Sequence, residues 1–256
     1  MLIANYHTHT PRCFHARGTE EEYVQAAKAA GIRILGFSDH APQWFPGDYY
    51  SGMRMYPHQL PEYCDTVRDL QKKYADRIQI HLGLEVEYYP AFFKDLLPRL
   101  RDQGIEYMIL GQHWPGNEMN EPYCGRATGR EEDLARYCNQ VREAMETGLF
   151  TYLAHPDLLY YTGDDKTYEF HMRRLCKAAK SCGMPLEINL WGMQQEKHYP
   201  DVRFWRVAAE EGNTVVIGAD AHEAWAVDNR EKEAIAMEMV KQFDLPLLKT
   251  VELRKI

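Results

Sequence analysis

Histidines and carboxylates recur along this chain at spacings that suit metal binding. The 256 residues include 11 histidines. They occur in His7-Thr8-His9, Ser38-Asp39-His40, Gly111-Gln112-His113, His155-Pro156-Asp157 and Asp220-Ala221-His222, and Glu85 stands two residues before Glu87. Imidazole and carboxylate groups together suit Zn²⁺, Mn²⁺ or Fe²⁺. The residue types therefore indicate a transition-metal centre.

The elements that must position these groups can be predicted from the hydrophobic pattern. Short apolar, β-favouring segments predict strands at 2–8, 34–39, 78–87, 107–112, 151–154, 185–190 and 214–219. A capping-box pattern at Thr19 predicts a helix that ends at Gly31. An apolar period of 3.6 residues predicts helices within 60–74, 131–147, 204–211 and 231–243. The alternation predicts a parallel α/β fold, a seven-stranded (βα)7 barrel, with an open doubly wound sheet as the alternative.

Six of these seven strands end in a residue type that binds metals. Active sites of parallel α/β folds lie at the carboxyl ends of the strands. Side chains two residues apart on a strand point the same way, so His7 and His9 are expected to converge. His58, His81 and His171 fall outside the strand ends and are interpreted as structural. His198 could reach the same end of the barrel, and its role stays open.

Bulk composition narrows the function classes. The chain carries 38 acidic and 30 basic residues, a net charge of −8, which argues against nucleic-acid binding through a general basic surface. No signal-peptide pattern and no 18-residue apolar run occurs, so no membrane association is expected. Six scattered cysteines without a CxxC motif are typical of free thiols. These features predict a single cytoplasmic domain over 1–256, and they leave the oligomeric state open.

The ordered motifs resemble the polymerase and histidinol phosphatase (PHP) superfamily, in particular its histidinol-phosphate phosphatase branch. The resemblance rests on Tyr6-His7-Thr8-His9, Cys13-x-His15-Ala16, Gly36-Phe37-Ser38-Asp39-His40-Ala41, Gly83-Leu84-Glu85-Val86-Glu87, His113, His155-Pro156-Asp157 and Gly218-Ala219-Asp220-Ala221-His222. It covers nearly the whole chain. It implies a distorted seven-stranded barrel of the TIM type with a trinuclear centre of divalent ions, Zn, Mn or Fe.

The resemblance also implies a set of ligands. One ion would be held by His7, His9, Glu85 and Asp220, a second by Glu85, His113 and His155, and a third by His15, His40 and His222. Asp39, Glu87 and Asp157 would orient the imidazoles from behind. Cys13 is interpreted as a bystander.

The implied activity is phosphomonoester hydrolysis by a metal-bound hydroxide, with L-histidinol phosphate of histidine biosynthesis as substrate. Alternatives are a phosphatase or phosphodiesterase acting on another small phosphorylated metabolite or a nucleotide, and a non-catalytic metal-binding module. The chain departs from the branch at Asn189-Leu190-Trp191-Gly192, where many relatives read Asn-Thr-Ser-Gly followed shortly by a basic residue. Arg17, Tyr161, Trp191 and His198 are the predicted substrate contacts. Arg12, Arg126 and Lys197 could also supply a cation, although surface roles are favoured.

Overall fold

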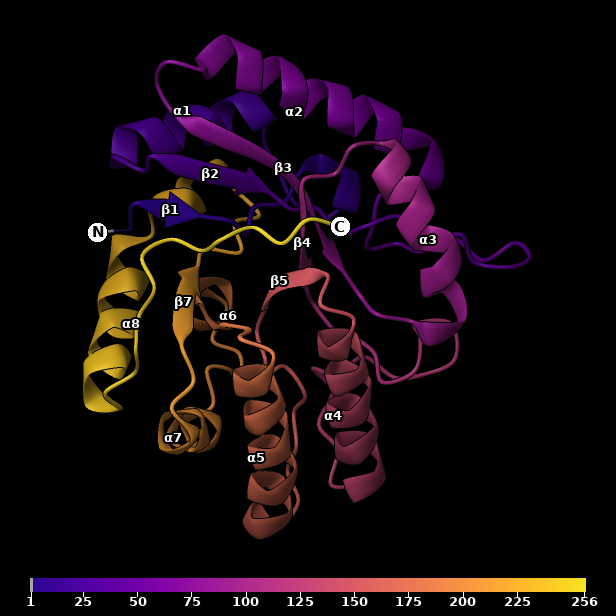
Figure 1. The fold of residues 1–256 in the computed structure, drawn as a ribbon, viewed down its shortest axis with the longest axis vertical. Helices are drawn as coiled ribbons and strands as arrows, with labels where there is room; N and C mark the ends of the chain where they lie inside the picture. The colour runs from indigo at the N-terminus through magenta and orange to yellow at the C-terminus, as the bar shows by residue number, and fades with distance from the viewer. Residues whose placement is uncertain (1) are drawn as a thin grey trace.

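Seven parallel strands form the centre of the molecule. The computed structural model describes residues 2–256, and its strands lie side by side in chain order (Figure 1). They are β1 (Ala4–Asn5), β2 (Ile34–Phe37), β3 (Gln79–Val86), β4 (Tyr107–Leu110), β5 (Phe150–Leu153), β6 (Leu186–Asn189) and β7 (Val215–Gly218). A helix or helix pair follows every strand, which is the arrangement that the alternating hydrophobic pattern predicts.

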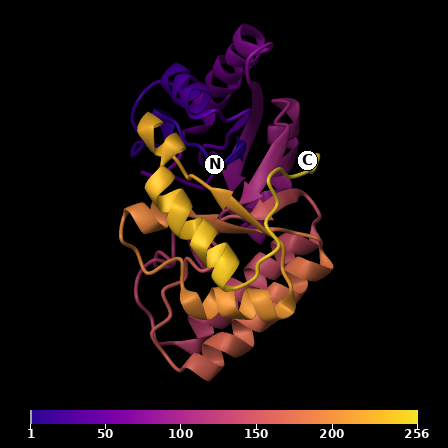
Figure 2. The ribbon, with the colours of Figure 1, turned by 90° about the vertical axis from the view of Figure 1, so that its left-hand side faces the viewer.

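Residues 2–256 form eight α-helices. The helices lie around the strands (Figures 1 and 2). They are α1 (Glu20–Ala30), α2 (Leu60–Tyr74), α3 (Pro90–Asp102), α4 (Glu131–Glu146), α5 (Asp165–Ser181), α6 (Leu190–Gln194), α7 (Val202–Glu211) and α8 (Arg230–Gln242). The capping box at Thr19 and the C-cap at Gly31 confirm the predicted ends of α1. No helix among residues 2–256 has both the length and the apolar character that crossing a membrane requires.

The two edge strands meet, so the sheet is nearly closed. Thr8 and Ala221 form a parallel bridge beyond the ends of β1 and β7. The His9 amide donates to the Ala221 carbonyl at 2.9 Å, and the Ala221 amide donates to the His7 carbonyl at 3.2 Å. The predicted distorted (βα)7 barrel is therefore confirmed, and the open doubly wound alternative is wrong.

Some predicted boundaries differ from those observed. The strand expected at 2–8 is a ladder of only Ala4–Asn5, and beyond it Thr8 forms an isolated bridge with Ala221. Helices α3 and α5 fall outside the ranges that apolar periodicity predicts. Pro90 begins α3, and the Asp164 carboxylate caps α5 by accepting from the Thr167 amide at 2.9 Å.

Three tyrosines and four smaller apolar residues form a second buried cluster, in the barrel interior. Tyr6, Tyr107 and Tyr152 pack there. The C-terminal segment covers the N-terminal ends of the strands through Leu248, Val251 and Leu253. The Val251 amide donates to the Tyr6 hydroxyl at 3.4 Å. The N-terminal ends of the strands are thus closed, which leaves the carboxyl ends for a functional site.

Gly83 makes room for the ring of Tyr107, since a Cβ at this position would overlap three ring atoms. We expect Gly83→Ala to lower the free energy of unfolding by about 1–3 kcal/mol, through overpacking. Urea denaturation measures this difference. Gly52→Ala is the matched control, because a Cβ there meets no atom within 4 Å, and its effect should stay within about 0.5 kcal/mol. Equal effects of the two substitutions would contradict this description of the interior.

Candidate metal centre

The nine side chains predicted as ligands lie together at the carboxyl ends of the strands. Eight of them are buried, and His15 is the exposed member. Seven of the nine line a cavity of about 360 Å³, namely His15, His40, Glu85, His113, His155, Asp220 and His222. A cluster of imidazoles and carboxylates below a cavity is a site at which bound ions can meet a small molecule.

One group of ligand atoms surrounds Asp220. The Nε2 atoms of His7 and His9 lie 3.4 and 2.9 Å from Asp220 Oδ1. The same two nitrogens each lie 3.6 Å from Glu85 Oε2. All four atoms are buried and have no hydrogen-bond partner in the protein. Buried polar atoms without partners are costly, so their convergence fits a divalent cation.

The second group forms around the other oxygen of Glu85. His155 Nε2 lies 2.8 Å from Glu85 Oε1, and His113 Nε2 lies 3.6 Å from it. Glu85 therefore presents one carboxylate oxygen to each group. This geometry fits a carboxylate that bridges two ions.

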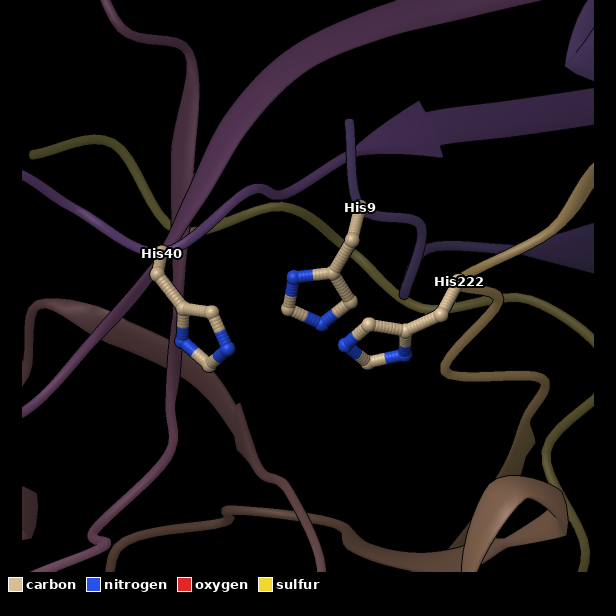
Figure 3. A group of neighbouring side chains, drawn as sticks. All are labelled: His9, His40 and His222. Carbon is tan, nitrogen blue, oxygen red and sulfur yellow. The ribbon is translucent and has the colours of Figure 1, made fainter. Parts of the chain in front are cut away.

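The third group is less separate than the resemblance implies. His9, His40 and His222 each offer a nitrogen within 4.8 Å of the others, and Figure 3 shows their rings around one space. Cys13, His15 and His222 form an overlapping group. His40 also turns its Nδ1 toward Glu85 Oε2 at 2.9 Å. The assignment of His15, His40 and His222 to one ion stays a prediction.

Carboxylates behind the imidazoles hold three of the rings. His7 Nδ1 lies 2.8 Å from Glu187 Oε1, and His113 Nδ1 lies 2.9 Å from Glu87 Oε1. His9 Nδ1 lies 3.4 Å from Asp39 Oδ1. A carboxylate behind a metal-binding imidazole fixes its tautomer and orientation. Asp39 and Glu87 thus occupy the places expected for them.

Glu187 is a component that sequence patterns missed. It stands within β6, the one strand whose end offered no ligand type, and it is fully buried. A lone glutamate inside an apolar strand was the available signal. Its second oxygen accepts from the His155 amide at 3.1 Å and from Asn189 Nδ2 at 2.9 Å.

Asp157 does not orient an imidazole. Its Oδ2 accepts from the Asp201 amide at 2.6 Å and from Trp205 Nε1 at 3.0 Å. The carboxylate thus holds the start of α7 against the barrel. No imidazole of residues 2–256 hydrogen-bonds to this carboxylate, so the structure does not support the role predicted for it.

Unusual backbone conformations and two glycines accompany the ligand cluster. His155 and Asp220 both have positive φ, 28° and 49°, which non-glycine residues adopt at a cost of about 1–3 kcal/mol. A Cβ at Gly111 would overlap the Glu85 carboxylate, and one at Gly218 would overlap that of Glu187. Both glycines therefore leave space for buried carboxylates.

The cavity wall is largely aromatic. Trp191 lines it and stacks on His222 with a centroid distance of 4.9 Å, and its contact with substrate stays a prediction. Trp114, Tyr123 and Tyr199 also line the cavity, and sequence patterns did not single them out. Lys197 is the sole lysine or arginine, among the described residues, that does so.

The other predicted substrate contacts lie elsewhere. Tyr161 is buried in the hydrophobic core and stacks on Tyr168. His198 stacks on Tyr160 at 4.2 Å, and its Nε2 hydrogen-bonds to a backbone carbonyl. Arg17 is exposed and is not part of the cavity lining. Tyr161 packs on helix α5 and His198 packs on Tyr160, contacts that no short sequence motif records.

The histidines interpreted as structural have partners outside the cavity. His81 Nδ1 lies 2.8 Å from Glu106 Oε2, and His171 Nε2 lies 3.1 Å from Glu131 Oε1. His58 lies in a short 3₁₀ helix, Pro57–Gln59. None of the three lines the cavity.

Burial and charge set the protonation of the ion-free cluster. Burial alone would lower the pKa of His7, but Asp220, Glu187 and Glu85 together raise it to about 10. Burial lowers the pKa of His40 to about 3. Without ions, the cluster thus keeps a proton on His7 to offset its carboxylates.

We expect Glu187→Gln to weaken binding of one ion by about 10- to 100-fold, because His7 loses the carboxylate that orients it. Chelator competition monitored by elemental analysis measures this affinity. Glu106→Gln is the matched control, since Glu106 lies at the same 2.8 Å from the Nδ1 of His81, outside the cavity. Equal affinities of the two variants would contradict the assigned role of Glu187.

Ion binding should release protons. His7 has a pKa raised to about 10 and so carries a proton at neutral pH, whereas a ligating imidazole must be neutral. Affinity is therefore expected to fall as the pH is lowered, by about tenfold per unit for each proton released. Calorimetric titration with Zn²⁺ at pH 7 in buffers of different ionisation enthalpy counts these protons. A count of zero would contradict the predicted protonation.

Comparison with known proteins places the chain in a family. The model of the PHP domain matches residues 5–190. A probable histidinol-phosphatase of Deinococcus radiodurans is 33% identical over 242 residues, covering 91% of each chain. One of Schizosaccharomyces pombe is 24% identical and covers 84% of this chain and 79% of that protein.

Solved structures show the same fold. Histidinol phosphate phosphatase of Lactococcus lactis, determined with zinc, L-histidinol and phosphate, superposes with a TM-score of 0.74 at 21% identity. The match covers 97% of this chain and 98% of that one. The family model and the Deinococcus relative, taken with the histidine and carboxylate cluster, show that this chain belongs to the PHP domain family.

Proposed function

We propose that this chain is a metal-dependent phosphomonoesterase that hydrolyses L-histidinol phosphate to L-histidinol and phosphate. The observation that carries the proposal is the convergence of four unpartnered buried atoms, from His7, His9, Glu85 and Asp220, beside an open cavity. The Deinococcus and Schizosaccharomyces relatives, both probable histidinol-phosphatases, support the substrate.

The nine ligand residues could hold three divalent ions. Because the seven imidazoles are neutral and only two ligands are carboxylates, the loaded site would keep a net positive charge. When bound, the ions would supply the positive charge that attracts a phosphate dianion and the acidity that activates water. The chain's own groups then need to bind the ester, orient it and keep the ligands in place. No serine or cysteine nucleophile is required.

The residues around the cavity have distinct tasks in this proposal. Glu187, Glu87 and Asp39 hold the imidazoles with their Nε2 atoms toward the ions. Lys197 lines the cavity and is the cation best placed to meet a phosphate oxygen. Trp191 offers a flat apolar face, which suits the imidazole ring of histidinol.

A second candidate is the same chemistry on another small phosphorylated ester with a flat group. The aromatic wall favours it equally, since Trp114 and Tyr123 would pack against any planar ring. The turn that departs from its relatives, at Asn189–Gly192, contributes Trp191 to this wall. Substrate preference therefore depends on the wall rather than on the ions.

Steady-state assays of the Zn²⁺- or Mn²⁺-loaded protein separate these candidates. We expect the highest kcat/KM with histidinol phosphate in a panel that includes nucleoside monophosphates and sugar phosphates. Removal of the ions by a chelator should abolish turnover, and their return should restore it. Efficient hydrolysis of another ester beside negligible turnover of histidinol phosphate would reject the substrate, and full activity after ion removal would reject the mechanism.

A further inference from the structure

Arg54 is a charged side chain that is almost completely buried. It belongs to the loop 41–56 between β2 and α2, and its exposed fraction is 1%. Two of its N–H groups donate to Glu87, at 2.6 and 2.9 Å. Nε donates to Glu118 Oε2 at 3.0 Å, and Nη1 donates to the Ala41 carbonyl at 3.1 Å. A buried guanidinium is tolerated only with such complete pairing.

The contact with Glu87 leads directly to the ligands. Glu87 Oε1, which accepts from Arg54, also lies 2.9 Å from His113 Nδ1. The opposite nitrogen of His113 lies 3.6 Å from Glu85 Oε1. Glu87 is therefore a carboxylate that can fix the His113 ring.

Arg54 also connects two loops that form the cavity wall. Its own loop contributes Met53, and the loop after β4, which carries Glu118, contributes Trp114 and Tyr123. Glu118 is buried, and its side chain reaches Arg54 through Oε2. One guanidinium thus joins both loops to the end of β3, where Glu87 stands.

We propose that Arg54 is a positioning residue that fixes Glu87, so that His113 presents Nε2 to the metal centre, and that holds the two loops in place. The inference rests on the metal centre proposed above. It predicts that Arg54 controls the affinity of the ion bound by His113, although no Arg54 atom contacts that ion.

The number of donors explains why arginine stands here. Five hydrogen bonds leave the guanidinium, to Glu87, Glu118 and the Ala41 carbonyl. Lysine has three donors on a single nitrogen and cannot form this planar pattern. Arg54→Lys should therefore preserve the charge but position Glu87 poorly.

The test compares Arg54→Met, Arg54→Lys, Glu87→Gln and the double variant Arg54→Met/Glu87→Gln. Chelator competition with Zn²⁺, read by elemental analysis, gives the number of ions and their dissociation constants. We expect one ion of Arg54→Met to bind about 10- to 100-fold more weakly, as in Glu87→Gln. The double variant should be no weaker than either single variant, because both act through the same His113 ring.

A spectroscopic measurement distinguishes a positioning role of Arg54 from a general destabilisation of the fold. Nitrogen-15 NMR of labelled histidines should show one ring that changes its tautomer in Arg54→Met and Glu87→Gln alike. Arg173→Met is the control, because Arg173 likewise pairs with carboxylates, those of Glu169, Glu210 and Glu211, but on outer helices. It should leave ion affinity and the histidine spectrum unchanged.

Each outcome decides the inference. Wild-type affinity in Arg54→Met, or additive losses in the double variant, would overturn it. If Arg54→Met does not fold, Arg54→Lys decides, and unchanged affinity in that variant counts against the inference. Absence of bound ions in the wild-type protein would reject the proposed metal centre itself, which a failure of the Arg54 variants alone would not.

Discussion

The structure depends on one buried carboxylate, that of Glu85. It is inaccessible to solvent, and imidazoles of His7, His9, His40, His113 and His155 lie 2.8 to 3.6 Å from its oxygens. Burial would raise its pKa, but the surrounding histidines lower it well below the usual value. An uncompensated buried charge costs several kcal/mol, so the other parts of the site must be arranged around this group. Gly111 illustrates the constraint, because any side chain there would displace the carboxylate.

The two ends of the barrel have different chemistry for a physical reason. At the N-terminal end, Tyr6, Tyr107 and Tyr152 and the C-terminal segment fill the interior with apolar contacts. At the carboxyl end, polar groups are buried, and each charged group is paired with a group of opposite charge or with an imidazole. Glu187 and Glu87 stand behind imidazoles, and Arg54 stands behind Glu87. The apolar interior therefore supports a site in which buried carboxylates are paired with imidazoles and with Arg54.

Much of the fold and the convergence of the site could be predicted from the sequence. The strands carry clear apolar segments, and ligand residue types follow them, so parallel pairing brings His7, His113 and Asp220 to one edge. Glu187 was missed, because a lone glutamate in an apolar strand indicates a buried carboxylate but has no spacing that assigns it to a metal centre. Arg54 was not predictable either, since its partners lie 33 and 64 positions away in the chain. The position of Tyr161 likewise depends on contacts that no motif records, with Tyr168 of α5 and with Thr128 in the loop after β4.

Anomalous diffraction from crystals of the zinc-loaded protein would show directly whether metal ions bind around Glu85. The account predicts three metal peaks at the carboxyl end of the barrel, with one oxygen of Glu85 toward each of two of them. His7, His9 and Asp220 should surround one of these two ions, and His113 and His155 the other. A single peak, or peaks that leave Glu85 without a metal neighbour, would contradict the account.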